Sequence, residues 1–190
     1  MRALSLFALS ITFLLSGCAI ESDRPLSSPR YAERDQRLEG LWRAKVGKDA
    51  IYFYIAYGHD GHGSILSFGR GKDGMGTMSW NFFVTRTAWH AYLNMTSLVS
   101  VDRGHIHQGP SKTYMFVEYR FSWRGQLVAS LVGGEVFSKA IKEGKLHGKT
   151  DLFTTIISHE TSERVLGFIE AAKPEDVFMK PWVATKIGGP

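Results

Sequence analysis

Four histidines in two glycine-containing segments of this chain have a spacing that would allow them to bind a metal ion. His59 and His62 lie in one segment, and His105 and His107 lie in the other. Side chains at positions i and i+2 of an extended strand share a face, so His105 and His107 could bind one metal ion together. If the two segments meet, the four imidazoles and Asp60 could hold zinc or copper, and the protein would then be a metal binder. The simpler interpretation is exposed loop histidines, and we therefore expect no metal site.

The patterns typical of enzymes are missing from the sequence. One cysteine in 190 residues excludes an intramolecular disulfide and any motif that needs paired cysteines. Residues 69–74 match the GxGxxG spacing, but a dinucleotide site needs a helix directly after it, and residues 77–85 have the composition of a strand. There is no nucleophile elbow. We predict that the protein is not an enzyme and uses no cofactor.

The composition is that of a folded domain without a nucleic-acid footprint. Hydrophobic residues make up 44% and aromatic residues 13% of the chain, which excludes intrinsic disorder. The 23 basic and 18 acidic residues are intermixed, so the net charge of +5 forms no basic stripe. We expect no nucleic-acid partner.

The N-terminus has the pattern of an export signal. A charged start, Met1-Arg2, precedes an apolar run over residues 3–15 and then Ser16, Gly17 and Cys18. This run has the length of a signal-peptide core and is too short to span a membrane. We predict a signal peptide over residues 1–17.

Leu15-Ser16-Gly17-Cys18 resembles the lipobox of bacterial lipoproteins. The resemblance implies cleavage before Cys18, acylation of its thiol, and attachment of the mature protein to a membrane. Two or more acyl chains hold a protein stably on a bilayer. Ala19 in place of aspartate favours, by the same resemblance, the outer membrane, with the protein facing the periplasm. The alternative is an ordinary export signal that contains a cysteine.

After the predicted anchor, the amino-acid composition of the chain changes at residue 38. Residues 18–37 are rich in proline, serine and charge, and we expect a flexible tether there. Residues 38–190 have the length of one domain. Short β-rich runs are predicted at 41–46, 50–57, 64–68, 77–85 and 88–95, with a hairpin at 112–131, a strand at 151–157 and a closing strand at 178–187. Helical spacing predicts two short helices, at 135–143 and from 161 or 162 to the proline at 174. The fold class is therefore mainly β, an antiparallel barrel with two short helices.

Gly40-Leu41-Trp42 resembles the Gly-X-Trp signature of lipocalins and related calycin barrels. This implies a lipocalin-like β-barrel that is closed at its base by Trp42 and commonly holds a small apolar ligand. Residues 92–94, 114–127, 140–148 and 166–178 are similar to an uncharacterised group of bacterial lipoproteins with a presumed lipocalin-like fold. That second resemblance implies no mechanism.

We expect a membrane-anchored lipoprotein that binds a small apolar or amphipathic molecule inside the barrel. Aromatic residues in candidate strands are the predicted base and wall of the ligand site: Trp42, Tyr52, Tyr54, Trp80, Phe82 and Trp89. A small barrel can also be filled by its own side chains. In that alternative the protein is a structural or interaction module that docks an envelope protein.

Overall fold

The computed structural model describes residues 19–46, 49–71, 74–102, 105–108, 111–151 and 154–189. Cys18 and the predicted signal peptide lie outside the described residues.

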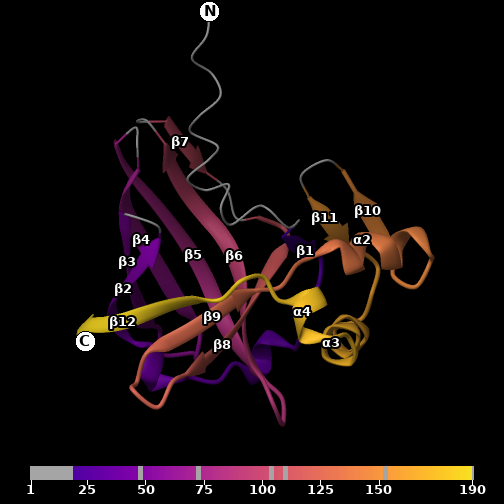
Figure 1. Ribbon diagram of the computed structural model, residues 1–190, viewed down its shortest axis with the longest axis horizontal. Helices are drawn as coiled ribbons and strands as arrows, with labels where there is room; N and C mark the ends of the chain where they lie inside the picture. Colours follow the sequence, from indigo (N-terminus) through magenta and orange to yellow (C-terminus); the bar gives the residue numbers. More distant parts are fainter. Residues whose placement is uncertain are drawn as a thin grey trace, which may run out of the picture.

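Eight strands form a closed antiparallel β-barrel (Figure 1), which confirms the predicted fold class. Around the ring they run β2, β3, β4, β5, β6, β8, β9 and β12, and β12 pairs with β2 to close it. Their bounds are β2 Gly40–Val46, β3 Asp49–Tyr57, β4 Gly63–Gly71, β5 Gly74–Arg86, β6 Ala91–Asp102, β8 Tyr114–Phe121, β9 Leu127–Leu131 and β12 Trp182–Gly188. A short strand, β7 (His105–Gln108), which the sequence analysis did not predict, extends the sheet beside the far end of β6.

The barrel forms because alternate residues of each strand are apolar and face its interior. Phe53 and Ile55 of β3 and Phe82 and Val84 of β5 are buried inside, as the two-residue period of a strand requires. Gly63 of β4 faces inward where the Phe82 ring passes, and a Cβ atom there would lie 2.3 Å from that ring. Strand periodicity therefore decides which side chains meet in the core.

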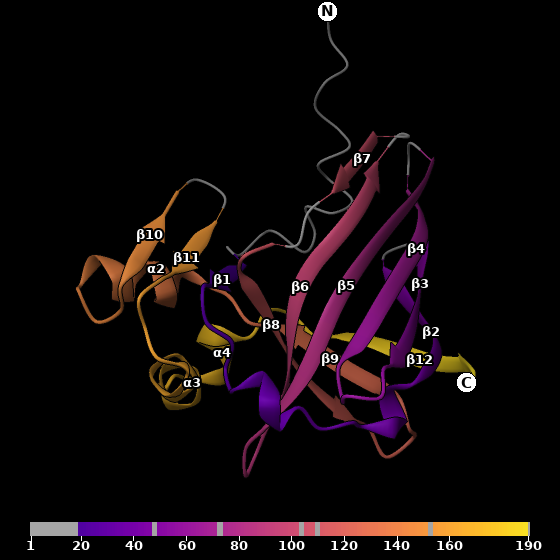
Figure 2. The same ribbon diagram turned by 180° about the vertical axis from the view of Figure 1, so that it is seen from behind.

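A second layer packs against the outside of the barrel beside β6 and β8 (Figures 1 and 2). Its core combines Tyr92 and Phe116 of the barrel with Phe137, Val165 and Ile169 of the helices. The layer contains α2 (Glu135–Lys142), α3 (Ser162–Ala171), α4 (Pro174–Val177), β10 (Gly148–Thr150) and β11 (Thr155–Ile157). None of the described helices is long and apolar enough to cross a membrane.

Both predicted helices are present, and α4 adds a third. Thr161 caps α3 by accepting a hydrogen bond from the Arg164 backbone N–H at 3.2 Å. Pro174 does not simply end the helical segment, because α4 begins at it and proline suits a first helical position. Of the predicted strand at 151–157, Thr155–Ile157 forms β11, and residues 152 and 153 lie outside the described residues.

The prediction of a flexible tether over residues 18–37 is wrong for the described part of that segment. Ile20–Ser22 forms strand β1, which lies between β8 and β11. Ile20 and Leu26 are buried, and the Leu26 N–H donates to Asn94 Oδ1 at 2.7 Å. Two 3₁₀ turns follow, η2 (Pro29–Tyr31) and η3 (Gln36–Leu38). Burial of a few apolar side chains holds a segment whose composition is typical of a flexible chain, so residues 19–38 belong to the folded unit.

Candidate functional site

Residues 33–39 close one end of the barrel. Leu38 and Trp42 are buried there, and Trp42 Nε1–H donates to the Leu38 carbonyl at 2.7 Å. Lys186 of β12 places its Nζ 5.5 Å from the Trp42 ring centroid, within the range of a cation–π interaction. Trp42 therefore lies at the base of the barrel.

A buried carboxylate holds this closing segment to three strands. Asp35 Oδ2 accepts hydrogen bonds from Arg86 Nη2 at 2.5 Å, Arg37 Nη2 at 2.7 Å and Tyr119 Oη at 3.0 Å. The Asp35 N–H donates to Tyr57 Oη at 3.2 Å. Both carboxylate oxygens and the backbone N–H of Asp35 have hydrogen-bond partners within the protein, so this network fixes the closed end.

The network shifts the pKa of its members in opposite directions. Burial opposes ionisation of Asp35, but hydrogen bonds from Arg37, Arg86 and Tyr119 outweigh it and hold the Asp35 pKa well below its usual range. Burial raises the pKa of Tyr57 to about 12. Burial and the neighbouring Asp35 charge also raise the pKa of Tyr119. At neutral pH the site is an ionised carboxylate with two neutral phenols and two guanidinium groups.

Above the base, the barrel interior is packed with its own side chains. The inward residues form one contiguous apolar cluster, which includes Phe53, Ile55, Ile65, Phe82 and Leu93. Phe82, predicted as part of the ligand wall, is a buried member of this cluster. A ligand can therefore not reach the closed end without displacing the core.

The opposite end is the mouth of the barrel, where Trp80, Trp182 and Leu131 are only partly buried over the core cluster. Trp182 begins β12 and Leu131 ends β9, both away from the closed end. β5 and β12 are half the ring apart, so Trp80 and Trp182 approach from opposite walls. The Trp182 ring packs edge-on against Phe53, with centroids 5.4 Å apart.

Trp80 carries an unpaired polar group at this mouth. Its Nε1–H is enclosed and has no hydrogen-bond partner among the described residues. A buried donor without an acceptor costs roughly 1–3 kcal/mol. A ligand oxygen could accept that hydrogen bond only if it displaced the side chains that enclose the N–H, and on this basis the mouth is the candidate binding site.

Three of the predicted wall residues lie outside the barrel. Tyr52 and Tyr54 alternate with the inward Phe53 and Ile55 and therefore face outward. Trp89 lies in the turn between β5 and β6, not in a strand, and 87% of it is exposed. The six predicted residues included aromatic side chains from both faces of the strands, whereas only one face of each strand can line the interior.

Trp182 was missed because it falls in a segment regarded only as a closing strand. The sequence of β3 also contains a pattern that could have assigned its two faces. Tyr52 and Tyr54 alternate with Phe53 and Ile55, so the two tyrosines lie on one face and the fully apolar side chains on the other. A phenol hydroxyl favours water, so the tyrosine face was the one to assign to the exterior.

The backbone does not bring the two histidine segments together. His59 and His62 precede β4, whose first residue is Gly63. His105–Gln108 pairs with β6 near Val101. Val101 pairs with Thr77 of β5, and Thr77 pairs with Phe68, which lies near the other end of β4. The side chains of His105 and His107 lie outside the described residues. Within the described part of the chain, no three His, Cys, Asp or Glu residues are grouped as metal ligands.

Two further polar clusters lie in or beside the helical layer. Glu160 is buried and accepts from the His147 N–H at 2.7 Å, from His147 Nδ1 at 2.8 Å and from Arg164 Nε at 2.9 Å. Burial opposes ionisation of Glu160, but these hydrogen bonds and the Arg164 charge lower its pKa. His90 Nδ1 lies 3.6 Å from Glu118 Oε1. Neither cluster contains a nucleophile with a base in reach, so both are interpreted as structural.

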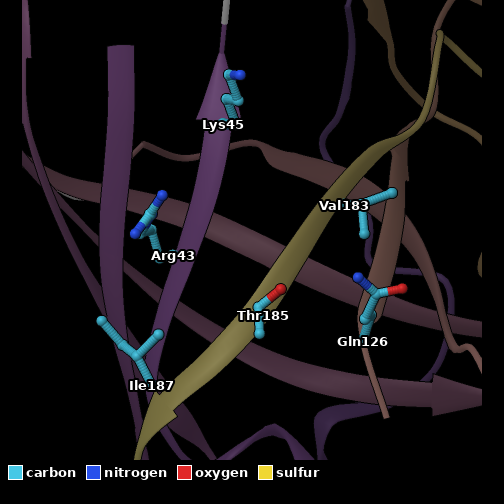
Figure 3. A pocket seen from close by; sticks show the side chains of 6 residues that line it. All are labelled: Arg43, Lys45, Gln126, Val183, Thr185 and Ile187. Atoms are coloured by element: carbon cyan, nitrogen blue, oxygen red, sulfur yellow. The ribbon is translucent and has the colours of Figure 1, made fainter. Parts of the chain in front are cut away.

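The surface of the described residues contains the following two hollows. One, of about 440 Å³, is lined by Arg43 and Lys45 of β2, Val183, Thr185 and Ile187 of β12, and Gln126 (Figure 3). The other, of about 210 Å³, lies between Gly133–Gly134 and the segment from Glu175 to Lys180.

No protein-family model matches the chain, and its comparison with curated proteins and with solved structures found no match either.

Proposed function

We propose that this chain is a lipid-anchored, non-enzymatic protein of the bacterial cell envelope that binds one small amphipathic molecule at the mouth of its barrel. The anchor is attributed to Cys18, on the pattern of residues 1–18. Its place is the outer membrane, with the folded unit in the periplasm.

The observation that carries the binding function is the unpaired Trp80 Nε1–H at the mouth. Trp80 and Trp182 offer apolar ring surface on opposite walls, and the packed cluster beneath them forms a floor. Apolar walls with a few well-placed polar groups are typical of small-molecule sites. A ligand with an apolar body and one acceptor oxygen fits this arrangement.

The filled interior favours a second candidate function, an interaction module. The contiguous inner cluster leaves the lower barrel packed, as in a small barrel that serves only as a scaffold. In this case the outer surface of the barrel or the helical layer would bind an envelope protein.

Native mass spectrometry distinguishes the two candidates. The protein is the exported chain from residue 18 to Pro190 with Cys18→Ser, which keeps β1 and prevents acylation. A bound mass of lipid size is expected, and Trp182→Ala should reduce its occupancy. The matched control is Trp123→Ala, since Trp123 lies on the β8–β9 turn and is 87% exposed. A protein that carries no ligand after incubation with an envelope lipid extract would overturn the binding function and leave the interaction module.

The anchor is tested separately. The full-length wild-type protein should fractionate with membranes and take up labelled palmitate, and the full-length Cys18→Ser variant should do neither. Palmitate uptake by the variant would overturn the assignment of Cys18.

A further inference from the structure

One half of the barrel wall is left open to solvent. The helices lie beside β8 and β6, and no helix covers the wall formed by β12, β2, β3 and β4 (Figures 1 and 2). Four of the seven exposed large apolar side chains among the described residues face outward here, each 41 to 49% exposed: Tyr54, Leu66, Val183 and Ile187. We call this surface the open wall.

The aromatic part of the open wall is ordered by strand pairing. Tyr52 pairs with Phe68 across β3 and β4, and the two rings stack with centroids 5.6 Å apart. Tyr54 pairs with Leu66 in the neighbouring row. These side chains form a continuous apolar strip on the outside of the barrel.

The charge of the open wall has one sign. The outward positions of the four strands contain three cations, Arg43, Lys45 and Arg70, and no aspartate or glutamate. Neither Arg43 nor Lys45 has a carboxylate partner among the described residues. Both line the hollow of about 440 Å³ between β2 and β12, beside the apolar Val183 and Ile187 (Figure 3). The wall therefore combines free positive charge with exposed apolar surface.

The start of the described chain lies on the side of the helical layer. Ala19 forms a bridge with Gly133, and β1 pairs with β8 and β11, so β8 and β9 separate β1 from β12 of the open wall. If Cys18 carries the lipid, its Cα atom lies about 3.8 Å from that of Ala19, the first described residue. No tether separates the folded unit from such an anchor.

We infer that the open wall is a membrane-contacting surface that binds anionic lipid headgroups. Arg43 and Lys45 meet the lipid phosphates, and the apolar strip inserts shallowly between headgroups, where tyrosine is well accommodated. A second copy of the chain is a poor occupant, since Arg43 and Lys45 would face their own like charges. The inference rests on the proposed function only in that a lipid anchor would keep the folded unit close to a membrane.

Vesicle binding by unlipidated protein tests the inference. The Cys18→Ser chain from residue 18 to Pro190 is mixed with vesicles of phosphatidylcholine, alone or with an equal part of phosphatidylglycerol, and binding is measured by sedimentation. We expect binding only to the anionic vesicles, weakened by salt. Each cation near a membrane surface contributes about fivefold, so Arg43→Gln with Lys45→Gln should lower the partition coefficient roughly 30-fold.

The matched control is Lys142→Gln with Lys149→Gln, which removes the same charge from exposed positions in the helical layer. It should change binding less than twofold. Equal losses for the two double variants would overturn the inference, because binding would then depend on net charge alone. Absence of binding to anionic vesicles would also overturn it, and would favour an acidic protein as occupant of the wall.

Thermal unfolding of each variant verifies that it is folded. Because the protein carries no acyl chain, a negative result here leaves the assignment of Cys18 and the mouth ligand untouched. Those two are decided by palmitate labelling and by native mass spectrometry.

Discussion

At the scale of single residues, the closed end depends on Asp35. Its carboxylate joins a segment before the first barrel strand to Arg86 at the end of β5 and to Tyr119 of β8. Breaking a buried ion pair is costly because the remaining groups lose their partner. Asp35 therefore organises the base of the barrel, beneath the core cluster that supports the mouth.

Asp35→Asn should lower the free energy of unfolding by about 2–3 kcal/mol at neutral pH, measured by urea denaturation. The matched control is Glu33→Gln, because Glu33 also contacts Arg86, at 3.3 Å, but its side chain is 65% exposed. An exposed pair contributes little, so this change should stay within about 0.5 kcal/mol. Equal effects would contradict a special role for the buried carboxylate.

The same pair of proteins predicts a pH dependence. The folded-state pKa of Asp35 lies below its ordinary value of 3.8. The contribution of ionised Asp35 to the free energy of unfolding is therefore complete above about pH 4. It is lost as the pH falls through the folded-state pKa of Asp35. The stability difference between wild type and Asp35→Asn should be constant near neutrality and shrink in acid, and a difference that grows in acid would contradict the sign.

At the scale of elements, the N-terminal segment is an integral part of the fold. Strand β1 pairs with β8 and β11, Leu26 is buried, and η3 closes the barrel. Burial of an aliphatic side chain stabilises a protein by roughly 1.5–3 kcal/mol. The whole domain is stable by only about 5–15 kcal/mol, so loss of this segment removes much of the total.

A chain that begins at Leu38 should fail to fold cooperatively, whereas a chain that begins at Ala19 should show a sigmoidal thermal transition by circular dichroism. A chain that begins at Ala32 retains Asp35 but lacks β1 and Leu26, and its transition should lie between the two. Full stability of the shortest chain would restore the interpretation of residues 18–37 as a tether.

At the scale of the whole molecule, the barrel strands contribute to the core of the helical layer as well as to their own. Tyr92 and Phe116 come from barrel strands, and they pack in the same cluster as Phe137 of α2 and Val165 of α3. Neither part can open without exposing apolar surface of the other. The molecule should therefore unfold as one unit.

Urea unfolding followed by far-ultraviolet circular dichroism and by tryptophan fluorescence should give coincident transitions. Phe137→Ala, a change within the helical layer, should move both midpoints together and cost about 3–5 kcal/mol. The five tryptophans lie outside the helices, so fluorescence reports on the barrel. A shift seen only by circular dichroism would show that the helical layer unfolds by itself.

Local patterns were sufficient to predict most elements. Apolar alternation and glycine-rich turns marked the strands, and helical spacing before Gly144 and before Pro174 marked α2 and α3. Trp42 was predicted at the base on a three-residue resemblance and lies there. These features depend on residues close in sequence, whose preferences act in nearly any fold.

The candidate site was predicted only in part. Trp80 lies at the mouth and Phe82 in the floor, whereas Tyr52, Tyr54 and Trp89 lie outside and Trp182 was missed. Aromatic content alone does not say which face of a strand turns inward. That choice follows from the register of the neighbouring strands, since a shift of one residue exchanges the two faces.

The sequence by itself determined the element types, the antiparallel barrel class and the expectation of an anchored, exported chain. Only the tertiary structure decided that residues 20–38 belong to the fold, that the lower barrel is filled, and that free cations and apolar side chains share one open wall. Asp35 meets Arg86 across 51 residues and Tyr119 across 84. Such contacts depend on the register in which eight strands close, and that register minimises the energy of the whole core rather than of any local segment.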